Sequence, residues 1–335
     1  MDKIQYISPS LFYYWEKCPL QAVLSKKTTK FFTSSPDADL GSLIHRFYEK
    51  HNEWNISSVE SFNLKWNTEI KKINNKLQDT NYYPIQWNAK YYTVKKQMLC
   101  KNLLIKASKT KHDVSNKFQH LYEEKIYNEN IGGKIDLLVV ENEKIKEIID
   151  FKTGDVFEKV KGKRQVKEIY KQQLALYCAV ILEKQDFIPK LFIETMNGRR
   201  IQIKVEKDFI TALNNRVKVL KEKINSKIET NTTESLANCT PENCEYCNYR
   251  PFCSAYKTTL FNTRIGLRID VHGNVSAIKT NGVLFKTTNE EYIIKNVQDK
   301  SKYQTIGEYE IYNLFYPENE DNVLYESKNT VFKYE

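Results

Sequence analysis

The sequence predicts an α/β protein in which helices flank a mixed β-sheet, with a helical N-terminal region before it and a small all-β region after it. Three observations predict this fold class. The N-terminal third has helical periodicity, and short runs of Ile, Leu and Val between residues 121 and 205 are interrupted by a helical segment. After Cys253 the pattern changes to alternating apolar and polar residues. With 335 residues, 41% of them hydrophobic, the chain can build one large core or two domains.

The N-terminal region is expected to contain several helices. Ser8 can cap a helix over residues 9–25, and Pro9 suits the first helical position. Residues 41–54 carry apolar side chains on one helical face, and residues 58–120 are rich in Lys and Asn with helical periodicity. We assign residues 1–120 to this region.

A sheet is expected next, beginning with three consecutive antiparallel strands that are separated by short turns. These strands are residues 121–127, 134–140 and 144–151. Two more strands, at 191–196 and 200–205, lie between predicted helices at 164–184 and 208–228. We assign residues 121–257 to this core and its cysteine cluster.

Residues 258–335 are expected to form a small β-rich domain of five to seven strands, with turn signals at 272–274, 281–282 and 317–319. A small barrel of the OB kind would suit single-stranded DNA through aromatic residues, namely Phe285, Tyr292 and Tyr303. The balance of 9 basic and 11 acidic residues from Phe261 onward argues against DNA binding here. A protein-interaction or structural role is at least as well supported.

The net charge of +10 favours a polyanionic partner, most obviously nucleic acid, and the excess of basic residues lies before residue 261. No run is long and apolar enough to span a membrane, and the N-terminus lacks the pattern of a signal peptide. A cytoplasmic location without membrane contact is therefore expected.

Two aspartates and a lysine stand in otherwise apolar predicted strands. Asp136 lies in the second strand, and Asp150 and Lys152 share one face of the third because side chains alternate along a strand. Two carboxylates can bind Mg²⁺ or Mn²⁺, and a neighbouring lysine can position a water molecule or offset phosphate charge. This set suits phosphodiester hydrolysis. The alternative is an ordinary salt bridge at an exposed strand end.

These residues resemble the RecB-like branch of the PD-(D/E)XK nuclease superfamily, whose pattern is a Gly-x-[Ile/Val]-Asp strand, an [Asp/Glu]-x-Lys strand and a Gln-x-x-x-Tyr helix. The sequence contains Gly133 with Asp136, Asp150 with Lys152, and Gln173 with Tyr177. The resemblance implies a restriction-endonuclease-like core, catalysis by Asp136, Asp150 and Lys152, and substrate contacts from Gln173 and Tyr177. Without the resemblance, Gln173 and Tyr177 would be ordinary helix residues.

Two further residues extend the resemblance. His45, in Gly41-Ser-Leu-Ile-His45, is similar to a helix histidine that contributes to the family's metal site together with Asp136 and Asp150. The strand before Gly133 matches one that carries an acidic residue in the family. We assign that catalytic role to Glu124, with Glu123 as the alternative.

Four of the seven cysteines fall within 15 residues, which is typical of metal binding rather than of a disulfide framework. Cys244-x₂-Cys247-x₅-Cys253 supplies three thiolate ligands for zinc or an iron–sulfur cluster. The fourth ligand is either Cys239, which would close a local zinc site, or the distant Cys18. Cys100 and Cys178 occupy apolar helical patterns and are expected in the core.

The family resemblance favours Cys18. A subset of RecB-like nucleases, similar to the AddB-type and CRISPR-adaptation exonucleases, binds a 4Fe–4S cluster through one cysteine before the core and three after it. Cys18-Pro19 and the C-terminal trio with Tyr249-Arg250 resemble that arrangement. The resemblance therefore implies a structural 4Fe–4S cluster on Cys18, Cys244, Cys247 and Cys253, with zinc as the alternative.

The resulting hypothesis is a metal-dependent deoxyribonuclease, an exonuclease on single strands or DNA ends, in repair, recombination or phage DNA processing. The chain has no phosphate-binding loop of the ATPase type, so any helicase or repair partner would be a separate protein. The alternatives are a catalytically silent DNA-binding or scaffold protein of the same fold and a zinc-binding interaction protein. Cleavage polarity, endonuclease versus exonuclease action, preference for DNA over RNA and oligomeric state are left open.

Overall fold

A computed structural model describes residues 1–29, 31–112, 118–304 and 307–334. The chain folds into two compact units, each made from separate stretches of sequence. Unit 1 comprises Met1–Glu16, Pro36–Asn75 and Ile85–Asn231, and unit 2 comprises Lys17–Ser35, Lys76–Pro84 and Thr232–Glu335.

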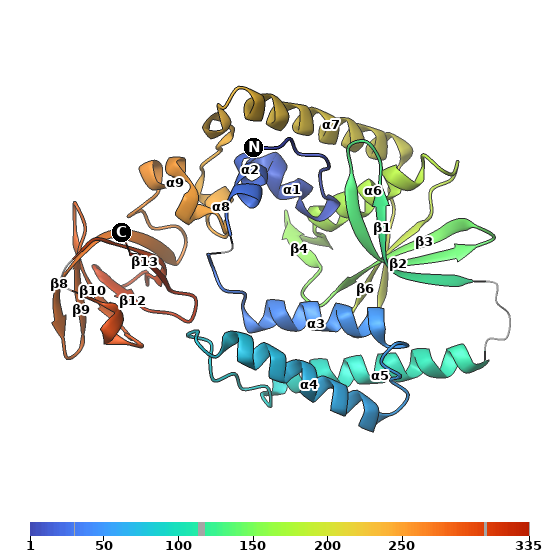
Figure 1. Ribbon diagram of the computed structural model, residues 1–335, viewed down its shortest axis with the longest axis horizontal. Helices are drawn as coiled ribbons and strands as arrows, with labels where there is room; N and C mark the ends of the chain where they lie inside the picture. The colour runs from blue at the N-terminus through green and yellow to red at the C-terminus, as the bar shows by residue number, and fades with distance from the viewer. Residues whose placement is uncertain (30, 113–117, 305–306, 335) are drawn as a thin grey trace. The chain divides into compact units, whose positions relative to one another are not determined.

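Unit 1 is built on a five-stranded mixed sheet with the order β1-β2-β3-β6-β7 (Figure 1). The first three strands are antiparallel, β3 and β6 are parallel, and β7 is antiparallel to β6. This confirms the predicted mixed sheet. The strands are β1 Gln119–Tyr127, β2 Gly132–Glu141, β3 Lys144–Lys152, β6 Lys190–Thr195 and β7 Arg200–Ile203.

Helices cover both faces of this sheet. One face, which includes Leu137 and Ile149, shares a hydrophobic core with α3, α4 and α5, and α6 packs against β1, β3 and α7. Each helix buries one apolar stripe, as expected for a helix on a sheet. The helices of this unit are α1 Pro9–Lys17, α3 Pro36–Lys50, α4 Val59–Leu77, α5 Lys90–His112, α6 Glu168–Ile181 and α7 Lys207–Glu229.

Several helix predictions differ from the structure. The helix expected over residues 41–54 is α3, Pro36–Lys50, and the helical region expected over 58–120 is divided into α4 and α5 and gives way to β1 at Gln119, with residues 113–117 outside the described residues. The helix predicted over residues 9–25 ends at Lys17 and resumes as α2, Leu20–Lys27, because Pro19 disfavours helical geometry in Cys18. The helix predicted to begin at residue 164 begins at Glu168.

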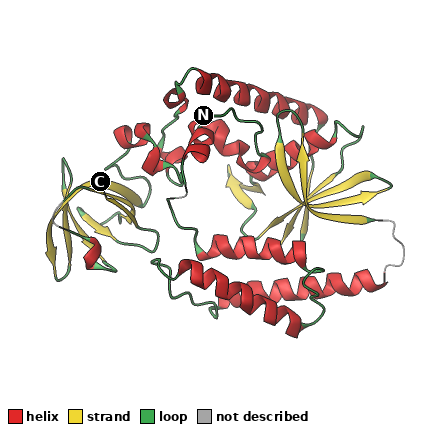
Figure 2. Ribbon diagram, in the orientation of Figure 1, coloured by secondary structure: helices red, strands yellow, loops and turns green. Residues whose placement is uncertain are grey.

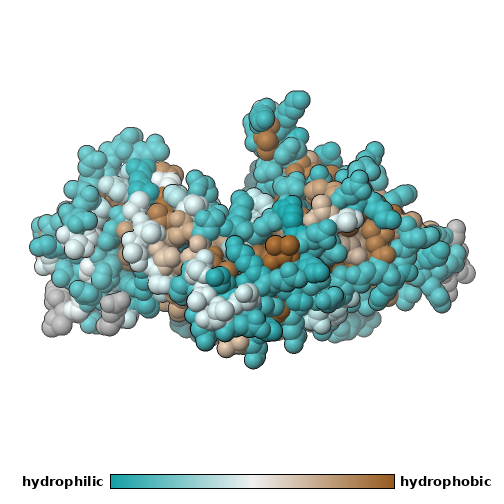
Figure 3. Space-filling view, turned by 90° about the horizontal axis from the view of Figure 1, so that it is seen from above, coloured by the Kyte–Doolittle hydropathy of each residue, from teal (hydrophilic) through white to brown (hydrophobic). Residues whose placement is uncertain are grey.

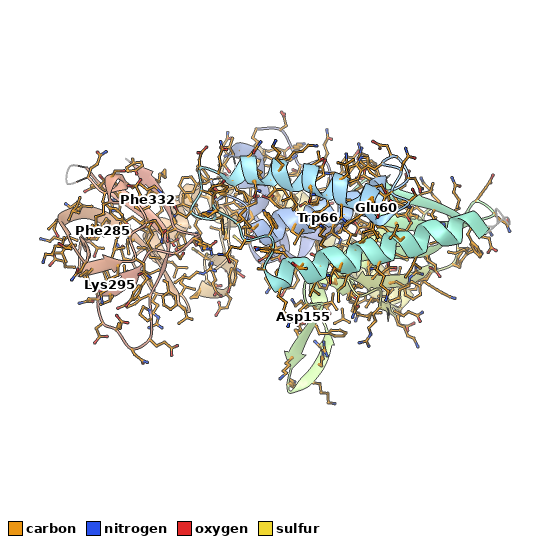
Figure 4. All side chains as sticks on the ribbon, turned by 90° about the horizontal axis from the view of Figure 1, so that it is seen from below. Glu60, Trp66, Asp155, Phe285, Lys295 and Phe332 are labelled. Carbon is orange, nitrogen blue, oxygen red and sulfur yellow. The ribbon has the colours of Figure 1, made fainter. Side chains whose placement is uncertain are left out.

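Residues 157–166 instead form a β-hairpin of β4, Phe157–Val160, and β5, Lys163–Val166. Its two-residue turn is Lys161-Gly162, and both residues have a positive φ, the geometry of the tight turn that suits a twisted hairpin. In Figure 4 the hairpin follows the labelled Asp155 and projects from the neighbouring ribbon.

Unit 2 combines short helical segments with a six-stranded β-sheet, seen at the C-terminal end of the chain in Figure 2. The helical segments are α2, η1 Thr233–Leu236, α8 Pro241–Cys244, η2 Arg250–Phe252, α9 Ser254–Thr259 and η3 Lys300–Lys302. The strands are β8 Arg268–Lys279, β9 Gly282–Lys286, β10 Glu291–Lys295, β11 Tyr309–Phe315, β12 Val323–Tyr325 and β13 Val331–Tyr334. The predicted β-rich C-terminal region is confirmed.

Two expectations for this region are wrong in detail. The predicted turn at 272–274 lies inside β8, where a Cβ on Gly273 would come within 2.0 Å of the Lys286 carbonyl oxygen. The glycine is thus explained by close strand approach and not by a turn. Phe285, Tyr292 and Tyr303 are buried in the core of the unit, so they are not available to stack on DNA bases.

The described helices include none that is both long enough and apolar enough to cross a membrane. Figure 3 shows a face on which hydrophilic residues predominate and hydrophobic residues gather only in small areas.

Candidate functional site

Three acidic residues lie in a row across strands β1, β2 and β3. Glu123 stands opposite Asp136, because its neighbours form the pairs Tyr122–Leu137 and Glu124–Ile135. Asp136 stands opposite Asp150 by the same count, one step beyond the pair Leu137–Ile149. The antiparallel register therefore brings together carboxylates that are up to 27 positions apart in the sequence.

Asp150 forms the buried centre of a polar network. Its side chain is 4% exposed, and one carboxylate oxygen lies 2.7 Å from the Lys152 Nζ. The other oxygen accepts a 2.9 Å hydrogen bond from the Gln173 amide on α6, and Lys152 also donates to the Gln173 Oε1 at 3.3 Å. Asp150 and Lys152 of the strand motif are thus in direct contact with Gln173 of the helix motif.

Burial and charge set the protonation of this network. Burial raises the pKa of Asp150 to about 6, although the neighbouring Lys152 opposes the shift. Burial alone would lower the pKa of Lys152, but the charges of Asp150 and Asp136 outweigh it and raise that pKa above its usual value. Lys152 is therefore a cation at neutral pH and is suited to stabilise negative charge.

A second group of ligand atoms adjoins this network. His45 on α3, Glu123 on β1 and Asp136 on β2 each offer one atom within 4.8 Å of the others. The His45 Nδ1 lies 3.3 Å from Asp136, whose other oxygen accepts a 2.7 Å hydrogen bond from the Phe151 N–H. Two carboxylates and an imidazole fit a divalent cation such as Mn²⁺.

Glu123, and not Glu124, belongs to this group. Glu124 is exposed and lines a separate groove with Leu138 and Val180. Glu123 has a φ of 55°, a left-handed conformation that is uncommon outside glycine and that concentrates at functional sites. Pairing β1 with β2 residue by residue from their connecting turn would have placed Glu123 opposite Asp136. The sequence did not show at which residue that turn begins.

Tyr177 stands one helical turn after Gln173 on α6. Its hydroxyl donates a 2.8 Å hydrogen bond to the Lys134 carbonyl, and the Gln173 amide lies 3.4 Å from the same hydroxyl. A Cβ at Gly133 would be only 3.2 Å from the Tyr177 ring and 3.0 Å from Pro9. Gly133 therefore allows α6 to approach β2 closely, and Tyr177 positions Gln173.

Five of the seven cysteines line one small, largely apolar pocket in unit 2. They are Cys18, Cys239, Cys244, Cys247 and Cys253. The sulfurs of Cys239 and Cys244 lie 3.4 Å apart, but no three cysteine sulfurs of the described residues fall within 4.8 Å of one another. The pocket brings both candidates for the fourth ligand to the C-terminal trio.

Backbone N–H groups point at the sulfurs of three of these cysteines. Asn238 donates to Cys18 and Tyr256 donates to Cys253, each at 3.4 Å, and Tyr249 donates to Cys247. Such donors stabilise thiolate ligands of metal centres. Burial raises the pKa of Cys247 and of Cys253 to about 11, so these thiols would release protons on binding a metal.

Comparison with protein families agrees with this geometry. Residues 6–254 match the model of the PD-(D/E)XK nuclease superfamily. The chain belongs to this superfamily. PD-(D/E)XK nucleases are generally metal-dependent nucleases, so the row of carboxylates beside Lys152 lies in a fold associated with that chemistry.

Solved structures include one described as a "Putative exonuclease" from Eubacterium rectale, 13% identical in sequence with a TM-score of 0.39. The match covers 68% of this chain and 82% of that chain. Among curated proteins, none matches the chain.

Proposed function

We propose that this superfamily member is a deoxyribonuclease that uses Mg²⁺ or Mn²⁺ and acts as an exonuclease on single strands or DNA ends. The observation that carries the proposal is the contact of Asp150, Lys152 and Gln173 beside the His45, Glu123 and Asp136 group. Repair, recombination or phage DNA processing are the settings we propose for this activity.

In this proposal Asp136, Asp150 and His45 hold the cation, and Glu123 takes the role first assigned to Glu124. The cation would lower the pKa of a bound water and stabilise negative charge on the phosphate. The Phe151 N–H fixes one oxygen of Asp136, which leaves its other oxygen directed at His45. The ligands are therefore oriented before any metal binds.

Lys152 is proposed to hold the attacking water in line and to offset charge on the phosphate. Its raised pKa disfavours a role as a proton acceptor in the metal-free protein. Asp150 and Gln173 restrict the rotation of the Lys152 side chain, because the ammonium group forms an ion pair with Asp150 and donates a hydrogen bond to Gln173. Gln173 and Tyr177 are proposed to face the substrate.

The β4–β5 hairpin supports a polyanionic substrate. It joins β3, which carries Lys152, to α6, which carries Gln173, and Lys159 and Arg164 lie directly opposite each other across it. Like charges in this position destabilise a hairpin, and neither side chain has an ion-pair partner among the described residues. A phosphate backbone would supply the missing negative charge.

The structural cofactor that we propose is a 4Fe–4S cluster on Cys18, Cys244, Cys247 and Cys253, which would relate the chain to the iron–sulfur subset of RecB-like nucleases. Support comes from the shared pocket and from the three N–H groups directed at sulfurs. The cluster would join α2 to the segment that follows α7 within unit 2, and its binding free energy would add to folding free energy.

Cleavage of end-labelled single-stranded and duplex DNA with Mg²⁺ or Mn²⁺ tests the nuclease proposal. We expect Lys152→Met to slow cleavage at least about a thousandfold, because charge stabilisation in the transition state is lost. Lys190→Met is the matched control, since Lys190 is exposed at the opposite end of the same sheet. Undiminished cleavage by Lys152→Met would refute the assignment, and no cleavage by the wild type with either metal would favour a silent DNA-binding protein.

A further inference from the structure

The β-rich part of unit 2 closes into a small barrel. Strands β8, β9 and β10 form an antiparallel meander, β12 is parallel to β10, and β11 pairs with both β12 and β8. The fifth strand is thus inserted between the third and the fourth, which is a Greek-key order. A five-stranded Greek-key barrel is the OB-type architecture, which often binds single strands on the face of its second and third strands.

In this barrel the face of β9 and β10 is poorly suited to nucleic acid. Lys295 on β10 lies 3.7 Å from Glu320, and Lys286 stands opposite Glu291 in the β9–β10 register. The loop between β11 and β12 adds further acidic residues, including Asp321. The cations on this face are therefore matched by nearby carboxylates.

A second concave surface of the same unit has the opposite character. A groove of about 600 Å³ lies between the Glu245–Asn248 segment, the Asp79–Tyr82 segment and the barrel residues of β13 and η3. Of its charged lining residues, four are basic and two, Asp79 and Glu245, are acidic. All of its lining residues belong to unit 2.

Three of the four cations in the groove have no ion-pair partner within the part of the chain that the structure describes. They are Arg268, Lys302 and Lys328, whereas Arg250 is buried against Asp270. Lys302 donates a hydrogen bond to the neutral Asn81 side chain at 3.2 Å. Asp270 lies near enough to Arg268, and Asp299 and Glu326 to Lys302, to interact electrostatically with them, but none of these carboxylates forms an ion pair with them, so the cations remain available to an anion.

Aromatic rings line the groove beside these cations. Tyr246 is 69% exposed, with the Arg268 guanidinium 5.0 Å from its ring centre. Tyr334 is 54% exposed and its ring lies nearly parallel to that of Phe332. Exposed aromatic faces next to unpaired cations are the two components by which proteins hold single-stranded nucleic acids. Figure 4 labels Phe332 and Lys295 at separate places on the barrel.

We propose that this groove, and not the face of β9 and β10, binds single-stranded nucleic acid. Phosphates contact Arg268, Lys302 and Lys328, and bases stack on Tyr246 and Tyr334. The inference rests on the proposed function for the choice of DNA, and it adds a second binding site that is separate from the carboxylate row. The proposal also accounts for DNA binding by a C-terminal region with more acidic than basic residues, because the cations of the groove and most of the region's carboxylates lie on different parts of the surface.

Binding of fluorescently labelled oligothymidylate to the full chain in EDTA tests the proposal without cleavage. We expect Arg268→Gln combined with Lys328→Gln to weaken binding about tenfold and to reduce the slope of log affinity against log salt by about 1.4, from two lost phosphate contacts on a single strand. The matched control is Lys286→Gln combined with Lys295→Gln, which removes two cations from the other face and should change affinity less than twofold. The reverse pattern would overturn the proposal.

A second variant separates stacking from charge. Tyr334→Ala should weaken binding about tenfold with an unchanged salt slope, because it removes a stacking surface and no charge. Tyr334 is preferred to Tyr246 since it is remote in sequence from the cysteines. Equal competition by polyglutamate and oligothymidylate would show that the groove selects only negative charge and would contradict a nucleic-acid site.

The two proposals fail separately. If the wild type cleaves DNA and the groove variants bind like the wild type, the groove is not a binding site and the nuclease proposal stands. If the wild type cleaves nothing but the groove variants lose binding, the groove proposal stands and the nuclease proposal fails. Thermal unfolding of each variant, matched to the wild type, shows that the altered surface residues have not disturbed the fold.

Discussion

The carboxylate row of unit 1 and the cysteine pocket of unit 2 are both clusters of buried and half-buried side chains of types that bind metals, but their polar groups have different partners. Asp150 already has an ammonium group and an amide as partners, and Asp136 has a backbone N–H and His45. In the cysteine pocket, the thiols face a largely apolar lining and one another, and three of them accept weak hydrogen bonds from backbone N–H groups.

We propose that this difference corresponds to two uses of metal. The carboxylate row is organised by the protein itself, so a cation there would supply chemistry and contribute little to folding. Among the described residues, the thiols of the cysteine pocket have no charged side chain as a hydrogen-bond partner and accept hydrogen bonds only from backbone N–H groups and from one another, so a metal centre there would supply much of the local stability. The following predictions test that contrast, beginning with the largest expected effect.

Removal of a cysteine ligand should have the largest effect on stability. We expect Cys18→Ser to abolish iron binding and to lower the free energy of unfolding by more than about 4 kcal/mol, because loss of a metal centre is among the costliest single changes. Iron, sulfide and zinc analysis of anaerobically purified protein, with thermal unfolding, measures both. About four iron atoms per wild-type chain are expected for one cluster.

Two matched variants complete this test. Cys239→Ser should retain the cluster if Cys18 is the fourth ligand, and Cys100→Ser should retain it because Cys100 packs against the core of unit 1. A single zinc that is lost in Cys239→Ser but kept in Cys18→Ser would contradict the cluster and assign the fourth ligand to Cys239.

Asp150 should make the metal-free protein less stable as the pH rises. Burial raises its pKa from 3.8 to about 6, so between these values the folded state binds more protons than the unfolded state. The free energy of unfolding in EDTA should therefore fall with rising pH across this window, by up to about 3 kcal/mol. Urea unfolding across the window should show a smaller decrease for Asp150→Asn than for the wild type.

The matched control for this pH effect is Asp155→Asn, because Asp155 is exposed in the loop that follows β3. Its pH dependence should parallel that of the wild type. If Asp150→Asn also parallels the wild type, burial of Asp150 does not determine the pH dependence, and the carboxylate row is less dehydrated than its geometry indicates.

The smallest expected effect distinguishes the two adjacent glutamates. Glu123→Gln should weaken Mn²⁺ binding about tenfold, since Glu123 shares a site with His45 and Asp136. Glu124→Gln should bind Mn²⁺ like the wild type because Glu124 is exposed in a different groove. Isothermal titration with Mn²⁺ measures both, and a loss confined to Glu124→Gln would restore the original assignment.

Motif spacing predicted most of unit 1. The alternation of apolar residues around Asp136 and Asp150 predicted two neighbouring strands, and the four-residue spacing of Gln173 and Tyr177 predicted one helix face. The β4–β5 hairpin was missed because its four cations obscure the apolar alternation, and only the Lys161-Gly162 turn signals it. The expected division at residues 120 and 257 stays a prediction.

The sequence by itself determined which residue types are available: a carboxylate–lysine set on one strand, a Gln–Tyr pair on one helix and a spaced cysteine trio. Local periodicity suffices for this, because side-chain direction repeats every two residues in a strand and about every 3.6 in a helix. Only the tertiary structure decided that Glu123 joins His45 and Asp136, that Cys18 and Cys239 share one pocket, and that unpaired cations gather in a groove of an acidic region. Strand register and the packing of segments that are distant in sequence bring these residues together. Neither can be read from the residue spacing within a single segment.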